Sequence, residues 1–221
     1  MSIERINLRK LLQLFFATER KQRSLLLADI RNDASKQAGN SERGGDFYGP
    51  FWADVKDHVA GGPDLLTSTD GRIRANATRK RLYPILAESF LAMWNEKMRW
   101  RNEPFQFVPE SVKAELPIKE LGTVVRIENT AAVQVSDGSH RIIYPYFSEE
   151  PPLPDEGARL GFWALRTALP QYGANDMRIV DVQRKAYFRP SEIAARGDEE
   201  RQFVQRYASL LRTWRKLKEE R

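Results

Sequence analysis

The stretch GTVVRIENTAAVQVSDGSHRIIYPYF, residues 122–147, decides the fold class of this chain. It contains runs rich in Val, Ile and Tyr (GTVVRIE, AAVQVS and HRIIYPYF) that have the composition of β-strands. Asp137-Gly138 separates the last two runs, and this dipeptide is a strong signal for a tight hairpin turn. The stretch therefore predicts three successive antiparallel strands.

Helical patterns precede these strands. The first forty residues repeat apolar side chains at helical spacing, which predicts one bent helix or two. FWADVKDHVA, residues 51–60, predicts a short helix, whereas DLLTSTDG, residues 64–71, predicts a loop because it is rich in turn-forming residues. From Pro84, apolar residues recur every four positions, so we expect a helix that begins there and reaches about Arg101.

The sequence after residue 147 predicts a helix over 155–169, a bent strand or hairpin over 177–188, and a closing helix from about Asp198 with a continuous apolar stripe. We therefore expect an α+β fold. A helical amino-terminal lobe, residues 1–103, would precede a mainly antiparallel sheet flanked by helices, residues 104–221, within one compact unit.

Composition narrows the class of protein. The chain has 221 residues, of which 41% are hydrophobic and 30% are charged, and no apolar run approaches the roughly 18 residues of a membrane span. The segment MSIERINLRK lacks the apolar core of a secretory signal, so we expect a cytoplasmic protein without a membrane partner. The absence of Cys excludes a disulfide framework and a thiolate nucleophile. We expect no cofactor and no metal site.

Positive charge is concentrated in one segment. Between Gly71 and Arg101 there are eight basic residues and two acidic ones, so this segment alone carries the net charge of +6. A localised field of this kind attracts polyanions. The candidate binding residues are the basic side chains of the segment and the tryptophan between its last two arginines: Arg72, Arg74, Arg79, Lys80, Arg81, Lys97, Arg99, Trp100 and Arg101.

The triplet Arg79-Lys80-Arg81 stands just ahead of the helix that we expect from Pro84. The amino end of a helix already carries partial positive charge, so a basic triplet there favours a bound anion such as phosphate. The alternative is that the triplet forms ion pairs with acidic residues elsewhere in the chain. Four such residues lie between a predicted strand and the next helix: Glu149, Glu150, Asp155 and Glu156.

Trp100 lies between Arg99 and Arg101. Interleaved aromatic and basic side chains suit a nucleic-acid surface, where a ring stacks on a base and guanidinium groups hold phosphates. In the alternative interpretation, Trp100 packs beneath the sheet and the arginines extend to solvent.

Motifs for catalysis are absent. There is no Walker loop, no G-x-S-x-G elbow and no H-E-x-x-H. Asp54-Val55-Lys56 spells half of a nuclease motif, but it lies in a segment predicted to be helical. Asp181, in the apolar run RIVDV, is a better candidate for a functional carboxylate, although an ion pair with Arg178 or Arg184 explains it equally well.

The element order from Gly122 to Phe188 resembles the core of the PD-(D/E)XK nuclease superfamily, especially its RecB-type branch. The resemblance implies a restriction-endonuclease-like scaffold for about a third of the chain. The positions that carry acids, lysine, glutamine and tyrosine in that branch are occupied here by other residues: Val125, Tyr144, Tyr146, Arg159 and Trp163. Because metal-dependent hydrolysis needs those carboxylates, the resemblance implies a catalytically inactive scaffold.

We therefore expect a non-enzymatic protein that binds nucleic acid, DNA in preference to RNA, through its basic helical surface. One alternative is an interaction subunit that docks on an acidic protein partner. Another is a metal-dependent nuclease that uses acids such as Glu128, Glu149 and Asp181.

Overall fold

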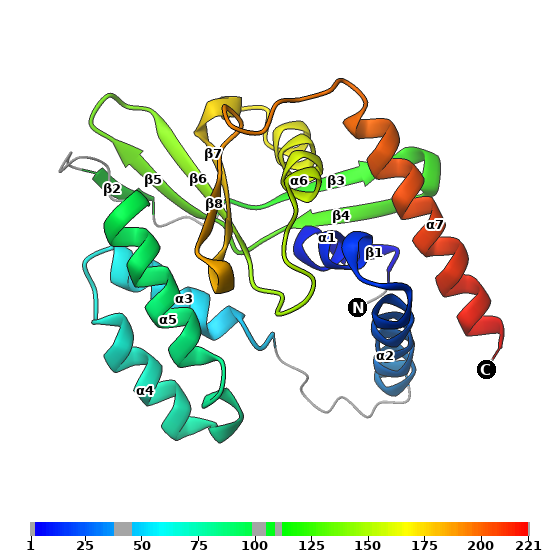
Figure 1. Cartoon of the computed structure of the whole chain (residues 1–221), viewed down its shortest axis with the longest axis horizontal. Helices are drawn as coiled ribbons and strands as arrows, with labels where there is room; N and C mark the ends of the chain where they lie inside the picture. Colours follow the sequence, from blue (N-terminus) through cyan, green and yellow to red (C-terminus); the bar gives the residue numbers. More distant parts are fainter. Residues whose placement is uncertain (1–2, 38–45, 99–104, 109–111, 221) are drawn as a thin grey trace.

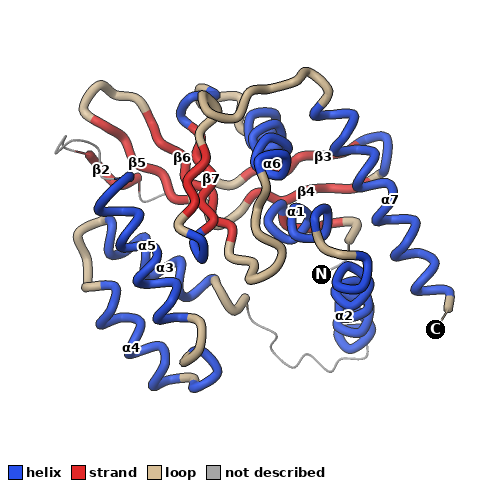
Figure 2. The backbone as a smooth tube through the Cα atoms, in the orientation of Figure 1, coloured by secondary structure: helices blue, strands red, loops and turns tan. Residues whose placement is uncertain are grey.

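A computed structural model of the chain describes residues 3–37, 46–98, 105–108 and 112–220 (Figure 1). Figure 2 shows the strands in the middle of the molecule, with helices on both sides of them. The α+β class predicted from the sequence is confirmed. None of the helices in the described ranges is both long enough and apolar enough to cross a membrane.

A five-stranded sheet forms the centre of the fold, in the order β2-β5-β6-β7-β8. Neighbouring strands are antiparallel except β6 and β7, which are parallel and are joined through helix α6 (Asp155–Ala168). The Asp137-Gly138 turn joins β5 to β6 as predicted, and Gly138 has a φ of +82° that suits glycine. The strands are β2 Phe105–Val108, β5 Ala131–Val135, β6 His140–Tyr146, β7 Met177–Asp181 and β8 Ala186–Phe188.

A separate three-stranded sheet has the order β1-β4-β3, from Arg5–Asn7, Thr123–Ile127 and Ala114–Ile118. The prediction of three successive antiparallel strands in 122–147 is therefore wrong for the first of them, because β4 pairs with β1 and β3 and not with β5. The chain passes from one sheet to the other through residues 128–130. Asn129 has a φ of +61° there, which turns the backbone between the two sheets.

Side chains of β6 alternate between two apolar cores. Ile142, Tyr144 and Tyr146 face the first core, whereas Ile143 and the following Phe147 face the second. A strand that is buried on both faces must be covered by other elements on both sides. The first core lies against α1 (Leu8–Phe16), α2 (Glu19–Gln37), α6 and α7 (Glu199–Glu219), and the second lies against α3 (Gly49–Val59), α4 (Leu65–Ala75) and α5 (Tyr83–Met93).

Residues on both sides of position 103 contribute to each core. Helices α1 and α2 join the carboxy-terminal helices around the first core, while α3–α5 pack on the opposite face of the central sheet (Figure 1). The apolar stripe of the closing helix is buried in the first core, as its pattern predicted. Its members are Phe203, Tyr207, Leu210, Leu211, Trp214 and Leu217.

Of the two alternatives for the first helical region, the structure has two helices, α1 and α2, because the chain turns at Ala17 and Thr18. Two other helical segments differ from the prediction. Residues 65–75 form α4 and not a loop, since Asp64 caps the helix by accepting a hydrogen bond from the Thr67 N–H at 3.0 Å. The helix that contains Pro84 ends at Met93 and continues as a π-helical turn over Trp94–Met98.

Candidate nucleic-acid interface

Arg79, Lys80 and Arg81 lie in the turn between α4 and α5, directly ahead of the α5 amino end. Pro84 occupies the first turn of α5, and Leu82 at the N-cap provides no side-chain hydrogen bond. No capping side chain therefore satisfies the backbone N–H groups at this helix end, which adds partial positive charge beside the triplet.

Arg72 and Arg74 occupy the last turn of α4, where positive charge is favourable. Arg72 forms a two-point ion pair with the buried Asp54, with its Nε and Nη2 atoms 2.9 and 2.8 Å from the carboxylate oxygens. This ion pair joins α4 to α3, and it neutralises the charge of Arg72 within the protein. Arg74 is exposed and has no ion-pair partner within the described residues.

The basic triplet has three different environments. Arg79 turns towards the protein, with its guanidinium carbon 5.4 Å from the centre of the Tyr83 ring. Lys80 points into solvent, and the ranges that the structure describes give it no ion-pair partner. Arg81 donates two hydrogen bonds to Glu149, at 2.5 and 2.7 Å, and these bonds hold the pKa of the Glu149 carboxyl below its usual value. The sequence left open that the triplet forms ion pairs with acidic residues elsewhere in the chain, and Arg81 forms such a pair with Glu149.

For the remaining predicted binding residues, the structure describes no side chain. Lys97 belongs to the π-helical turn, but its side chain is not among those described. Arg99, Trp100 and Arg101 lie outside the described residues.

Further cations surround the loop that follows β6, residues 147–150. Arg184 donates from Nη1 to the Ser148 carbonyl at 2.9 Å and from Nη2 to the Glu149 carbonyl. The charge of Lys21 adds to that of Arg81 in lowering the pKa of Glu149. Lys21 lies on α2 and Arg184 lies in the turn after β7. The sequence alone does not show that these two elements lie close together.

Arg9 reaches the same loop from α1. Its guanidinium carbon lies 5.2 Å from the Tyr48 ring centre and 5.3 Å from that of Phe147. The two rings stack at 5.0 Å, and Arg9 also donates to Asp46 at 3.2 Å. We refer to the four cations around the 147–150 loop, together with Lys80 next to Arg81 in the chain, as the basic cluster: Arg9, Lys21, Lys80, Arg81 and Arg184.

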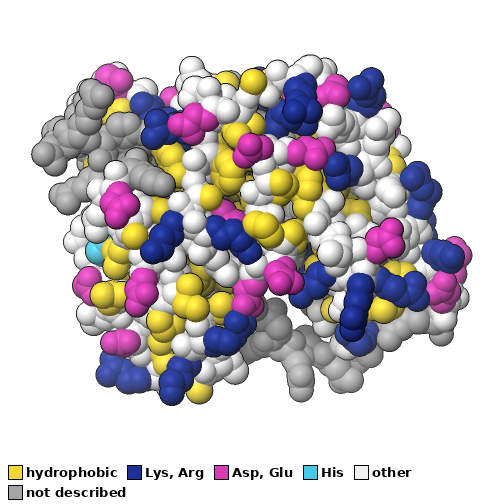
Figure 3. All heavy atoms as spheres, in the orientation of Figure 1, with side chains coloured by type: hydrophobic (Ala, Val, Ile, Leu, Met, Phe, Trp, Pro, Cys, Tyr) yellow, Lys and Arg dark blue, Asp and Glu magenta, His cyan; other side chains and the backbone are white. Residues whose placement is uncertain are grey.

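The loop at the centre of the basic cluster descends from β6 between the α3–α5 group and the α1–α2 group (Figure 1). In Figure 3, Lys and Arg side chains lie on both sides of this boundary, with acidic side chains between them. The carboxylates that contact the cluster are Asp46, Glu149 and Asp181. Glu150 belongs to the loop itself, so five cations against four acids leave an excess of one positive charge.

Asp181 is a structural residue of this region. It is fully buried at the end of β7 and accepts hydrogen bonds from the Leu153 N–H and from Arg184, both at 3.1 Å. Burial raises the pKa of its carboxyl. Of the two partners that the sequence offered, Asp181 pairs with Arg184, whereas Arg178 donates to the Tyr187 hydroxyl at 2.8 Å.

The three acids of the nuclease alternative are engaged with cations. Glu149 pairs with Arg81, Asp181 with Arg184, and Glu128 with Arg126 at 3.3 Å. In residues 3–37, 46–98, 105–108 and 112–220, no group of three or more His, Cys, Asp and Glu side chains is arranged to hold a metal ion.

The positions aligned with the PD-(D/E)XK pattern make packing contacts. Val125 is buried on β4, and the Tyr144 and Tyr146 hydroxyls donate to the Asn7 side chain at 2.9 Å and to the Pro151 carbonyl at 2.8 Å. Arg159 pairs with Glu199, and the Trp163 ring centre lies 4.9 Å from that of Phe203. The superfamily relationship itself stays a prediction.

Comparisons with protein-family models, with curated proteins and with solved structures gave no significant match. Any functional conclusion for this chain therefore depends on its own residues and their geometry.

Proposed function

We propose that this protein binds nucleic acid through the basic cluster, with double-stranded DNA as its ligand. The observation that supports the proposal most directly is the convergence of cations from four separate segments on one short loop. Arg9 comes from α1, Lys21 from α2, Arg81 from the turn before α5, and Arg184 from the turn after β7. Phosphates along a nucleic-acid backbone are spaced so that several such cations can be neutralised together.

Arg81 is the residue best suited to a phosphate contact. Its side chain is 68% exposed, and the paired Glu149 side chain is 42% exposed. Exposed ion pairs contribute only about 0–1 kcal/mol, so exchange of the carboxylate for a phosphate costs little. A guanidinium that donates two hydrogen bonds to a carboxylate can donate the same two bonds to two phosphate oxygens.

Salt dependence tests the proposal. We expect affinity for a DNA duplex to fall with salt concentration, and the slope to lessen by about 1.8 when Lys80→Ala and Arg81→Ala remove two phosphate contacts. The matched control is Arg212→Ala with Lys216→Ala, which removes two exposed charges from α7. Equal losses from both double variants would mean nonspecific attraction and would refute the site.

A second candidate is docking on an acidic protein, and the Glu149 carboxylate held by Arg81 is the observation that favours it. Competition separates the two functions. Polyglutamate and a DNA duplex are compared at equal charge concentration and equal salt. Displacement of bound DNA by polyglutamate at comparable concentrations would favour the acidic partner, whereas weak displacement would favour DNA. An RNA duplex of the same length tests the expected preference for DNA.

A further inference from the structure

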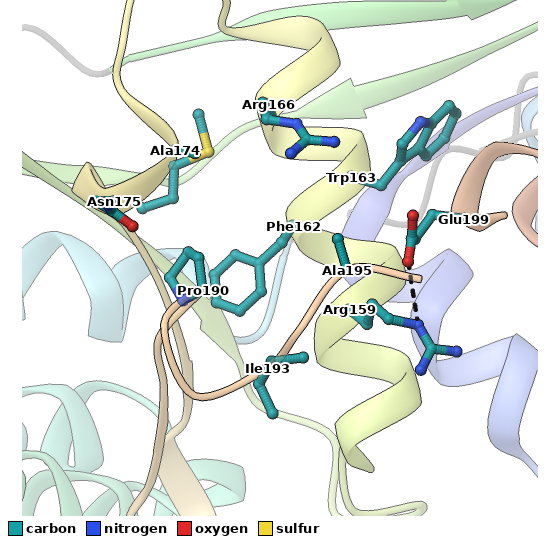
Figure 4. Close-up of a pocket in the computed structure, with 11 residues that line it drawn as sticks. Arg159, Phe162, Trp163, Arg166, Ala174, Asn175, Pro190, Ile193, Ala195 and Glu199 are labelled. Atoms are coloured by element: carbon teal, nitrogen blue, oxygen red, sulfur yellow. Dashed lines mark ion pairs between the residues drawn. The ribbon is translucent and has the colours of Figure 1, made fainter. Parts of the chain in front are cut away.

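A cavity of about 220 Å³ lies between α6 and the segment that leads from β8 to α7 (Figure 4). It is separate from the basic cluster and makes no use of its residues. Phe162 faces Pro190 and Ile193 across the gap, so its middle is apolar. Its polar groups come mainly from α6 and from the start of α7.

One face of α6 supplies an ordered set of side chains to this cavity. Arg159, Phe162, Trp163 and Arg166 stand at positions i, i+3, i+4 and i+7, which lie on the same side of a helix. Along α6, Phe162 and Trp163 stand between the two arginines, although their rings point to different sides of the helix (Figure 4). The arrangement presents flat apolar surface together with positive charge.

The charge of Arg159 is balanced inside the protein. Its side chain is 7% exposed, and its Nε lies 3.5 Å from Glu199 Oε1, as the dashed line in Figure 4 marks. Glu199 also accepts the backbone N–H groups of Arg196 and Gly197, at 2.6 and 3.1 Å. These bonds hold the end of the covering segment against α6.

The charge of Arg166 is not balanced in this way. Arg166 is exposed at the edge of the cavity, farther along α6, and the part of the chain that the structure describes gives it no ion-pair partner. Two cations and one carboxylate therefore line the cavity, which leaves one positive charge for a ligand. A monoanion with an apolar body complements both features.

From this complementarity we propose that the cavity binds a compact aromatic carboxylate. The ring would lie against Phe162, and the carboxylate would pair with Arg166. An engineered cavity of about 150 Å³ accepts benzene, so the larger volume here holds one ring and its acidic side chain. Aromatic rings stack or meet edge to face, which suits a contact between the ligand ring and Phe162.

Calorimetric titration of the full chain with 3-phenylpropionate tests the site in the absence of nucleic acid. We expect saturable binding of one molecule per chain. The neutral isostere 3-phenylpropionamide should bind at least about tenfold more weakly, because a hydrogen bond to a charged group is lost. Arg166→Gln should weaken binding of the acid by a similar factor, whereas Arg212→Gln, an exposed arginine on α7, should leave it unchanged.

A second variant fills the cavity without touching the cations. Ala195 is an exposed residue of the lining, and Ala195→Trp should abolish binding while the melting temperature stays near that of the parent. N-acetyl-phenylalanine then distinguishes two sources of the ligand. Equal binding indicates the carboxyl end of a peptide, and exclusion indicates a free aromatic acid. Absence of saturable binding to the parent protein, or equal affinity for acid and amide, would overturn the proposal.

Discussion

Arg81 and Glu149 face each other through two hydrogen bonds, Nη1 to Oε1 at 2.5 Å and Nη2 to Oε2 at 2.7 Å. The pair joins the turn ahead of α5 to the loop after β6, which lie 68 residues apart in the chain. Glu149 thus accepts hydrogen bonds from the same two Arg81 nitrogen atoms that the proposed DNA contact requires. In the proposed complex, this carboxylate and a DNA phosphate would compete for one guanidinium.

Glu149→Gln should strengthen DNA binding, because the neutral amide releases Arg81 for a phosphate. We expect affinity to rise by up to about fivefold, since an exposed ion pair that competes with the phosphate is worth about 0–1 kcal/mol, while the salt slope stays the same because the parent protein already makes the Arg81 contact. Fluorescence anisotropy across a salt series measures the affinity and the slope. Glu219→Gln on α7 removes the same charge at an exposed site, and equal effects of the two variants would contradict the competition.

Trp214→Ala should destabilise the fold by about 3–5 kcal/mol, since this side chain is 6% exposed in the first core. Chemical denaturation followed by circular dichroism measures the change. Arg212→Ala, two positions away and exposed on the same helix, should alter stability by no more than about 0.5 kcal/mol. Similar stability of both variants would show that α7 contributes little to the core.

Two glycines of α6 should differ in their tolerance of alanine. A Cβ on Gly157 would lie 2.7 Å from Leu153, 3.0 Å from the Phe16 ring and 3.1 Å from Pro154. Two of these neighbours are rigid rings, so we expect Gly157→Ala to destabilise the fold by about 1–3 kcal/mol.

A Cβ on Gly161 would meet only the methyl ends of Ile179, at 2.7 Å, and Leu12, at 3.3 Å. These methyl groups can move, and alanine gains about 1 kcal/mol over glycine inside a helix. Gly161→Ala should therefore cost less than Gly157→Ala when both are measured by thermal denaturation. The reverse order would contradict the packing shown at these two positions.

Stability should decline at alkaline pH. Burial raises the pKa of Tyr207 to about 12, from an ordinary value of 10.0. The unfolded chain therefore loses this proton first, so the stabilisation is complete below pH 10 and decreases as pH rises towards 12. The slope is about 1.4 kcal/mol per pH unit for one such group.

Tyr207→Phe isolates this contribution. The variant loses the hydrogen bond from the Tyr207 hydroxyl to the Ile3 carbonyl, at a cost of about 1 kcal/mol. Its free energy of unfolding should nevertheless fall less steeply above pH 10 than that of the parent. Urea titrations at several alkaline pH values provide the comparison, and parallel curves would show that Tyr207 does not titrate between pH 10 and 12.

Local patterns predicted most of the helices and strands. The Asp137-Gly138 turn, Pro84 in the first turn of α5 and the stripe of α7 depend on neighbours in the chain, so the sequence carries their signals. Helix α4 was missed because residues typical of turns, TSTDG at 67–71, occupy its middle. Its N-cap, Asp64, was the available signal.

Long-range relationships could not be predicted in the same way. The transfer of β4 to a second sheet depends on pairing with β1, whose three residues carry no strand pattern. The basic segment was visible in the sequence, but its pairings were not: Arg72 with Asp54 and Arg81 with Glu149 connect separate elements. Arg9 and Arg184 joined the candidate site only through the fold.

The bond from Tyr207 to Ile3 spans 204 residues and closes the first core. On the ribosome, the amino-terminal strand and α1 emerge long before the helix that completes their packing. The second core uses residues 51–182 and is complete before that helix is synthesised. We therefore expect a nascent chain to pack the second core first, while the apolar faces of α1, α2 and α6 that α7 covers stay exposed until α7 is translated. Chaperones can bind these exposed faces until then.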